Sequence, residues 1–435
     1  MVATSPSLAQ SGSRQDGLTI TGSSRVRYEM IAGQARAGFN DSDDLLNIRT
    51  TLAATWSADD WKVMAEVYDS RAYLADAGTP LSTSEVNALE VVQAYVARRV
   101  SLDGGARLDV QAGRFLLNLG SRRLVAADDY RNTTNSYTGV RADWSAPGGW
   151  SATGIYTLPQ QRRPDDRASL DDHVIRPDRE GFDLVLWGGL LARADALGGA
   201  TAEASFFHLG ERDTDGRPTR DRSLNTFGGR IIREPKAGSV DFEVEGFLQR
   251  GRVSTSAAPN APRQGVSAHF IHLEAGYTWP GGWKPRLSFE YDRASGDRSG
   301  GRFGRFDTLF GMRRAELAPS GLYNAFGRTN FSSPAVRVEV APSKRVDAFL
   351  SFRPIWLAEK TDAFSTTAVR DASGRSGKHA GEQLDARVRY WAIPDRLRLE
   401  VDGVFLAKGR FLREAPNAPR GGDTRYLSLN ATIGF

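Results

Sequence analysis

The chain has 435 residues, 40% of them hydrophobic, and its 57 lysines and arginines exceed its 52 acidic residues by five. No run of about 18 apolar residues is present, which excludes a transmembrane helix. It does not exclude membrane strands, since a barrel strand needs only about ten residues with every second one apolar. The absence of cysteine excludes disulfides, thiolate metal sites and cysteine nucleophiles.

The N-terminal residues resemble the end of an export signal. Ser7, Leu8 and Ala9 form a small-x-small triplet of the type that signal peptidase cuts, but a full apolar stretch does not precede them. We therefore expect residues 1–16 to be a signal-peptide remnant or a disordered lead-in. Residues 17–435 are expected to form a single domain.

Short segments with period-two alternation of apolar and polar residues recur along the rest of the chain. Such alternation is typical of strands with one apolar face. We predict eighteen strands, at 25–30, 47–56, 61–68, 86–101, 106–115, 137–144, 150–158, 182–192, 200–209, 224–233, 239–250, 266–279, 283–293, 332–341, 345–356, 384–391, 396–406 and 425–435.

The last of these strands shows the pattern most clearly. Its apolar positions are Leu427, Leu429, Ala431, Ile433 and Phe435, and the positions between them are small or polar. In a transmembrane barrel the last strand pairs with the first and leaves no open edge. We expect this strand to pair with residues 25–30.

The connections between the predicted strands alternate between short and long. The short ones are rich in Gly, Pro and Asp, as tight turns are. The long ones are 31–44, 73–85, 116–136, 159–181, 210–223, 251–265, 294–331, 357–383 and 407–424. Long loops at one end and short turns at the other are typical of outer-membrane barrels. The sequence therefore predicts an all-β fold, a transmembrane antiparallel β-barrel of eighteen strands.

Tryptophans support this architecture. Seven of the nine lie within a few residues of a predicted short turn, namely Trp56, Trp61, Trp144, Trp150, Trp279, Trp283 and Trp391. Tryptophan is enriched where a membrane protein meets the interface between lipid and water. The clustering predicts an aromatic girdle at the short-turn end.

Charged residues identify the inner face, because lipid-facing positions of a barrel must be apolar. The strands place acids and bases on that face, and arginine is the base best suited to bind carboxylates. The candidate solute-binding arginines on strands are Arg25, Arg27, Arg49, Arg141, Arg286, Arg337, Arg353, Arg387, Arg389 and Arg398. Two interpretations stay open: cross-strand ion pairs that stiffen the wall, or a basic track for an anionic solute.

Catalytic and metal-binding patterns are not found. The sequence has no serine nucleophile elbow and no P-loop, and His269 and His272 would lie on opposite faces of one strand. Glu290 and Asp292 share a face, but acids are common inside barrels. We expect neither enzyme activity nor a cofactor, a metal or a nucleic-acid partner.

Two segments resemble the alginate export family of Gram-negative outer-membrane porins. The first runs through 113–124 and 130–141 and contains Gly113-Arg114-Phe115, and the second runs through 306–331 and contains Gly327-Arg328-Thr329-Asn330. The resemblance covers residues 18–435. It implies an eighteen-stranded barrel with an arginine-lined constriction that conducts an anionic polysaccharide.

The resemblance also implies a place for several loop residues. Arg122, Arg123, Arg131 and Arg328 are expected near the constriction, on loops long enough to fold inward. Arg313 and Arg314 have two equal interpretations, the pore or an external surface that binds lipopolysaccharide phosphates.

The predicted function is passive passage of anionic solutes, such as alginate or another anionic saccharide, across the outer membrane of a Gram-negative bacterium. The alternative is a structural or adhesive barrel plugged by loop 294–331. Expected partners are outer-membrane lipid, lipopolysaccharide, the saccharide solute and the barrel-assembly machinery, which the resemblance to outer-membrane porins suggests would read the terminal Phe435.

Overall fold

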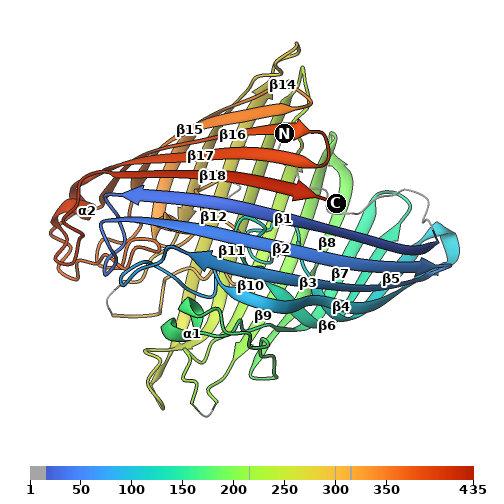
Figure 1. Ribbon diagram of the computed structural model, residues 1–435, viewed down its shortest axis with the longest axis horizontal. Helices are drawn as coiled ribbons and strands as arrows, with labels where there is room; N and C mark the ends of the chain where they lie inside the picture. Colours follow the sequence, from blue (N-terminus) through green and yellow to red (C-terminus); the bar gives the residue numbers. More distant parts are fainter. Residues whose placement is uncertain (1–15, 215, 299, 314–315) are drawn as a thin grey trace.

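The computed structural model describes residues 16–435, apart from 215, 299, 314 and 315, and within them the chain forms one sheet closed into a barrel (Figure 1). Every strand pairs antiparallel with the next one along the chain, and β1 pairs with both β2 and β18. The predicted eighteen-stranded antiparallel barrel is therefore confirmed. The lead-in expected over residues 1–16 lies outside the described residues except for Asp16.

The bounds of the elements follow the predicted alternation closely. The first nine strands are β1 (Gly17–Ala32), β2 (Ser42–Ala58), β3 (Trp61–Tyr73), β4 (Asn87–Ser101), β5 (Arg107–Leu116), β6 (Ser136–Ala146), β7 (Trp150–Pro159), β8 (Leu184–Leu197) and β9 (Ala200–Glu211). The other nine are β10 (Ser223–Arg233), β11 (Val240–Ser254), β12 (Arg263–Thr278), β13 (Arg286–Ala294), β14 (Phe331–Ser343), β15 (Val346–Trp356), β16 (His379–Ile393), β17 (Leu397–Lys408) and β18 (Thr424–Gly434).

The short helices lie in connections. They are the 3₁₀ turn η1 (Asp103–Gly105) between β4 and β5, α1 (Arg167–Asp171) and α2 (Arg410–Glu414). Among the described residues, the helices are all too short or too polar to cross a membrane.

The first and last strands, β1 and β18, pair and close the barrel as the sequence predicted. Val26 lies opposite Ala431 and Tyr28 opposite Leu429 in the β1–β18 ladder. The backbone of Gly22 exchanges two hydrogen bonds with that of Phe435, at 2.9 and 3.0 Å, and these extend the ladder by one residue. The closed barrel thus has no exposed strand edge in this region.

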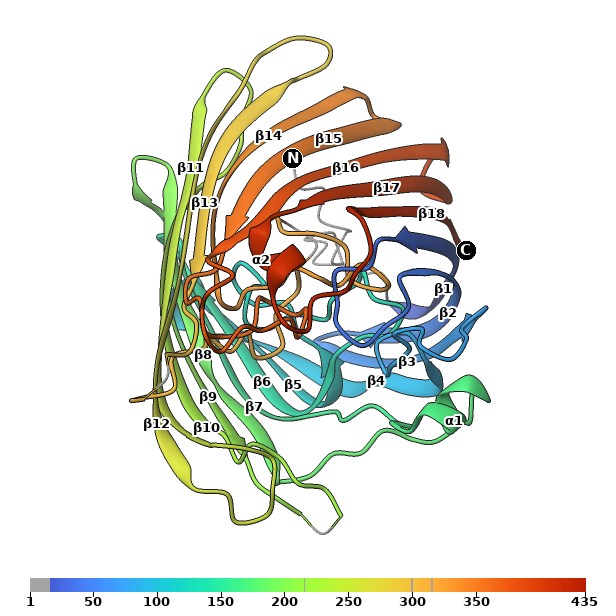
Figure 2. The ribbon, with the colours of Figure 1, turned by 90° about the vertical axis from the view of Figure 1, so that its left-hand side faces the viewer.

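Connections alternate in length as predicted, with the long loops gathered at the end that carries α2 (Figures 1 and 2). Some of the predicted bounds were wrong. The connection expected over 251–265 covers only residues 255–262, because β11 and β12 continue as a paired hairpin beyond the predicted bounds. The strand predicted at 25–30 is also longer, since β1 begins at Gly17.

The barrel wall has an apolar outer face. On β17, the side chains of Leu399, Val401 and Phe405 are exposed, whereas those of Glu400 and Asp402 between them are buried. The tryptophans near the short turns also lie on the outside, and Trp56, Trp61, Trp150, Trp279 and Trp283 have exposed side chains. This arrangement is the apolar belt with an aromatic girdle that a lipid environment requires.

Candidate functional site

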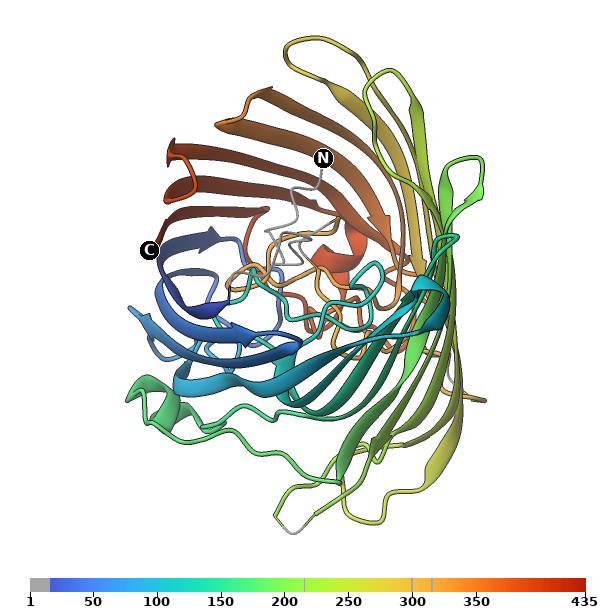
Figure 3. The same cartoon turned by 90° about the vertical axis from the view of Figure 1, so that its right-hand side faces the viewer.

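Two long loops enter the barrel and pair with each other. Loop 117–135 and most of loop 295–330 lie inside the ring of strands when the barrel is viewed from either end (Figures 2 and 3). Val125 and Phe310 form a parallel β-bridge. The Phe310 amide donates to the Leu124 carbonyl at 2.9 Å, and the Met312 amide to the Arg122 carbonyl at 3.1 Å. The lumen is therefore narrowed by a defined piece of structure.

Apolar contacts hold these loops in place. Their buried side chains join one cluster with residues of the wall and of loops 357–378 and 409–423. Phe326 packs edge-to-face on Phe331, with 4.7 Å between ring centroids, and is stacked with Phe364. Burial of such rings stabilises the loops by excluding water from a part of the lumen.

Arginines of β1 and β2 fasten loop 117–135 to the wall. Arg25 Nη1 donates to the Asp129 carbonyl at 3.0 Å, and Arg49 Nη1 donates to the Arg131 carbonyl at 3.1 Å. The guanidinium of Arg27 lies 3.9 Å from the centre of the Tyr130 ring, as in a cation–π contact. These three predicted solute-binding arginines therefore bind the loop itself.

Glu316 joins the two inserted loops by charge. Its Oε1 accepts hydrogen bonds from Arg123 Nε at 2.7 Å and from Arg328 Nε at 3.0 Å. Burial opposes ionisation of Glu316, but the two arginines hold its pKa well below its usual range. Arg123 also pairs with Glu243 and Glu245 of β11. The sequence placed Arg123 and Arg328 near the constriction, and both lie on the inserted loops.

Two adjoining cavities open at the long-loop end of the inserted loops. Their volumes are about 600 and 980 Å³, and both are lined by Arg131, Glu211, Arg217, Arg222 and Leu309. Ten arginines and three carboxylates line the two cavities together. The arginines are Arg131, Arg162, Arg163, Arg179, Arg217, Arg220, Arg222, Arg305, Arg313 and Arg328. We call this region the basic vestibule.

Part of the basic vestibule holds like charges close together. Burial, followed by the positive charge of Arg131, lowers the pKa of both Arg162 and Arg313 to about 10. Within the described residues, Arg162 Nε and Arg313 Nη1 are buried and donate no hydrogen bond. Because neighbouring cations repel one another, an anion placed among them is stabilised. Arg313 thus lines the vestibule, and Arg314 lies outside the described residues.

A third cavity, of about 320 Å³, lies toward the short-turn end and has mixed charge. Its lining includes Arg122, Arg123, Arg286 and Arg337. Carboxylates of β11, β12, β13 and β14 face these arginines, namely Asp241, Glu243, Glu274, Glu290 and Glu339. Arg286 pairs with Asp241, Glu274 and Glu339, and Arg337 pairs with Glu339 at 2.9 Å.

The remaining predicted arginines make ion pairs along the wall. Arg353 is 1% exposed and pairs with Glu290 at 2.6 Å and Asp292 at 2.8 Å. The others are Arg141 with Asp143, Arg387 and Arg389 with Asp347, and Arg398 with Glu400. Their role in solute binding stays a prediction. Their ion pairs are also those that would stiffen the wall.

Sequence reasoning missed most of the basic vestibule. Arg162, Arg179, Arg217, Arg222 and Arg305 lie on connections, where no strand period indicates which way a side chain points. The one available signal was the density of charge in 160–183 and 212–222, which together hold nine arginines and ten acidic residues. Its meaning depends on which loops fold toward the lumen.

The sequence profile described as alginate export matches residues 17–422 of the chain. Curated proteins gave no match. Solved structures similar to this one include three Pseudomonas aeruginosa proteins. OpdL has 10% identity and a TM-score of 0.61, with 96% of this chain and 98% of that chain covered. OccD3 (OpdP) has 12% identity and a TM-score of 0.59, covering 96% and 91%. OpdK, solved with vanillate, has 11% identity and a TM-score of 0.58, covering 96% and 98%. At such low identity these likenesses show a shared fold.

Proposed function

The chain belongs to the alginate export family, and we propose that it is a passive channel of the bacterial outer membrane for anionic solutes. The proposed solute class is an anionic polysaccharide or oligosaccharide such as alginate. The observation that carries the proposal is the basic vestibule, whose lining has ten arginines and three carboxylates. Six of these arginines also pair with a carboxylate, namely Arg131, Arg179, Arg217, Arg222, Arg305 and Arg328.

Arginine both attracts an anionic solute and orients its carboxylate groups. A guanidinium pairs with a carboxylate through two parallel hydrogen bonds, and a low-dielectric wall strengthens the attraction. Long loops of outer-membrane barrels face outward, which would place the basic vestibule at the cell surface. A chain of uronates would then meet a row of guanidiniums at one end of the channel.

Release requires that binding is not too strong along the whole path. Past the inserted loops, the lumen carries arginines and carboxylates in similar numbers. Mixed charge weakens the hold on an anion, as conduction demands. In the proposed channel, the wall arginines that pair with carboxylates, such as Arg353, set this balance.

The solved relatives agree with this solute class in one respect. OpdK was solved with vanillate, an aromatic carboxylate. We extend from that case only the chemical class of a carboxylate anion.

One observation favours the alternative of a plugged structural barrel. Loops 117–135 and 295–330 pair across the lumen through backbone hydrogen bonds and share a buried apolar cluster. A barrel closed by this contact would show almost no conductance in a planar bilayer, whereas a constricted channel shows a small but steady current.

The test of the solute class is block of single-channel current by a charged oligouronate and by a neutral oligosaccharide of equal length. We expect the oligouronate to block at a lower concentration. Arg131→Gln with Arg313→Gln should weaken that block, and Arg298→Gln is the matched control because its side chain is 80% exposed on the same long loop. Equal block by the neutral sugar would refute the proposal.

A further inference from the structure

Three glutamates of neighbouring strands lie directly opposite one another inside the barrel. Glu243 of β11 pairs in register with Glu274 of β12, which pairs in register with Glu290 of β13. Like charges in this arrangement repel and destabilise a sheet. The row therefore calls for positive charge close to it.

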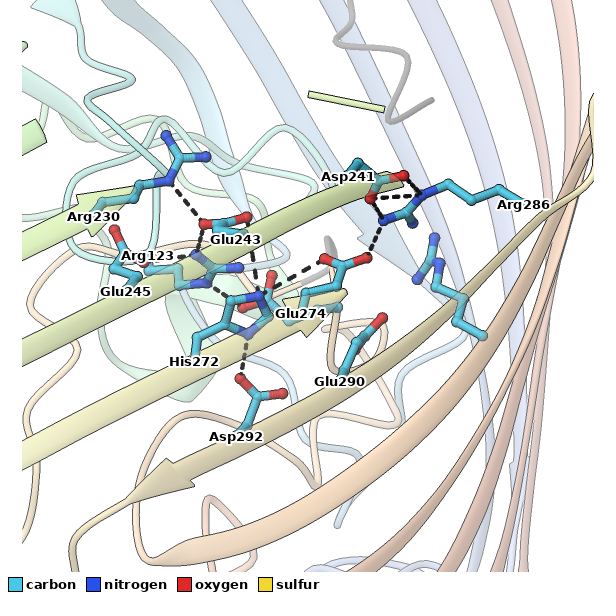
Figure 4. Close-up of polar contacts among 12 residues, drawn as sticks. Arg123, Arg230, Asp241, Glu243, Glu245, His272, Glu274, Arg286, Glu290 and Asp292 are labelled. Carbon is cyan, nitrogen blue, oxygen red and sulfur yellow. Dashed lines mark hydrogen bonds and ion pairs between the residues drawn. The ribbon is translucent and has the colours of Figure 1, made fainter. Parts of the chain in front are cut away.

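A buried histidine stands beside this row. His272 of β12 is fully buried, and its Nδ1 lies 2.7 Å from Asp292 Oδ1 on β13 (Figure 4). Its Nε2 lies 3.9 Å from Glu243 Oε2 and 3.8 Å from Glu274 Oε2. Among the described residues, this Nε2 is buried and has no hydrogen-bond partner. A buried ring nitrogen aimed between two carboxylate oxygens needs a specific explanation.

Arginines orient the two carboxylates and leave the facing oxygens available. Arg123 and Arg230 bind Oε1 of Glu243, and Arg286 binds Oε1 of Glu274 at 2.7 Å. In each carboxylate it is Oε2 that faces the histidine (Figure 4). The orientation of each possible ligand is thus fixed by a second residue.

We propose that His272 Nε2, Glu243 Oε2 and Glu274 Oε2 bind a divalent transition-metal ion such as Zn²⁺. These ligand atoms lie within 4.8 Å of one another. Zinc takes histidine nitrogen and carboxylate oxygen at about 2.0–2.2 Å, so binding draws the three atoms inward by a few tenths of an ångström.

Asp292 is the positioning residue of this site. Accepting a hydrogen bond from Nδ1–H of His272 leaves the lone pair on Nε2, and carboxylate–histidine–metal arrangements of this kind are common around zinc. Glu243 and Glu274 also line the cavity of about 320 Å³, through which an ion and a fourth, water ligand can enter. The competing explanation is a protonated His272 that serves as a cation in the ion-pair network.

Titration calorimetry of the purified barrel with Zn²⁺ alone, at about pH 8, separates the two explanations. We expect one ion per chain with saturable binding. Asp292→Asn removes the outer partner of the histidine and should weaken the affinity for zinc by about 10- to 100-fold. His272→Gln removes a ligand and should weaken it by at least as much. Absence of stoichiometric binding to the unchanged protein would leave the protonated histidine as the explanation and overturn the proposal.

Two control variants distinguish this site from adventitious zinc binding. His269→Gln changes a histidine of the same strand that faces outward with Leu248, and His379→Gln changes a surface histidine 2.8 Å from Glu382. Both should bind zinc as the unchanged protein does, and a loss equal to that of His272→Gln would contradict the assignment. If His272→Gln does not fold, the Cu²⁺ electron paramagnetic resonance spectrum of the unchanged barrel decides, since the site predicts coupling to one imidazole nitrogen.

Discussion

Gly311 of loop 295–330 lies directly against the backbone of loop 117–135, and adding one methyl group there should open the lumen. A Cβ atom at this position would lie 2.5 Å from the carbonyl carbon of Arg123 and closer still to its oxygen, whereas real Cβ atoms essentially never come within 3.0 Å of a neighbour. Both obstacles are backbone atoms, which cannot rotate away. Gly311→Ala must therefore push loop 295–330 away from loop 117–135.

The size of the effect follows from the hydrogen bonds at that contact. Phe310 N to Leu124 O, Ala126 N to Phe310 O and Met312 N to Arg122 O measure 2.9, 3.1 and 3.1 Å. At about 0.5–1.5 kcal/mol each, their loss weakens the contact between the loops by about 1.5–4.5 kcal/mol. The barrel ladders are untouched, so the strands should remain folded.

Single-channel recording in planar bilayers measures the outcome. We expect Gly311→Ala to increase the conductance and the current noise, because a loosened constriction is wider and moves more. Gly422→Ala is the matched control, since nothing lies within 4 Å of a Cβ added there. An unchanged conductance in a Gly311→Ala barrel with normal strand content would refute the idea that the paired loops set the width of the lumen.

Three other changes test separate parts of the account. Glu316→Gln should lower the thermal unfolding midpoint, since a buried ion pair that loses one partner costs about 3–5 kcal/mol, whereas exposed Glu414→Gln should not. Arg353→Gln should also lower that midpoint but leave the ratio of anion to cation current unchanged, and a changed ratio would place Arg353 in the ion path. Burial raises the pKa of Glu85 in loop 74–86 to about 6, so its protonated form favours the folded loop. Amide-exchange protection around Val86 should thus fall as the pH rises through 6, and Glu85→Gln should abolish that dependence.

Strand number and the inner face were predictable because both follow from local rules. Alternation in a segment such as Leu397–Lys408 decides which side chains meet lipid, and a one-residue shift would expose every charge. The start of β1 at Gly17 was not predicted, because Thr19 and Thr21 place small uncharged groups on the inner face and only charged residues identify that face in the sequence.

The candidate site was only partly predictable, because it depends on contacts between distant segments. Arg123 meets Glu243 on β11 and Glu316 on loop 295–330, and nothing local to residue 123 indicates either partner. Arg25 and Arg353 were correctly assigned to the inner face, yet one binds loop carbonyls and the other wall carboxylates. Period-two patterns fix the direction of a side chain and leave its partner undetermined.

The reversal potential of the unchanged channel in a potassium chloride gradient tests the central claim most directly. A basic vestibule predicts a potential displaced toward the equilibrium potential of chloride. Arg131→Gln with Arg313→Gln should move it toward zero, and Arg298→Gln should leave it in place. A reversal potential displaced toward the equilibrium potential of potassium would contradict passage of anions through this barrel.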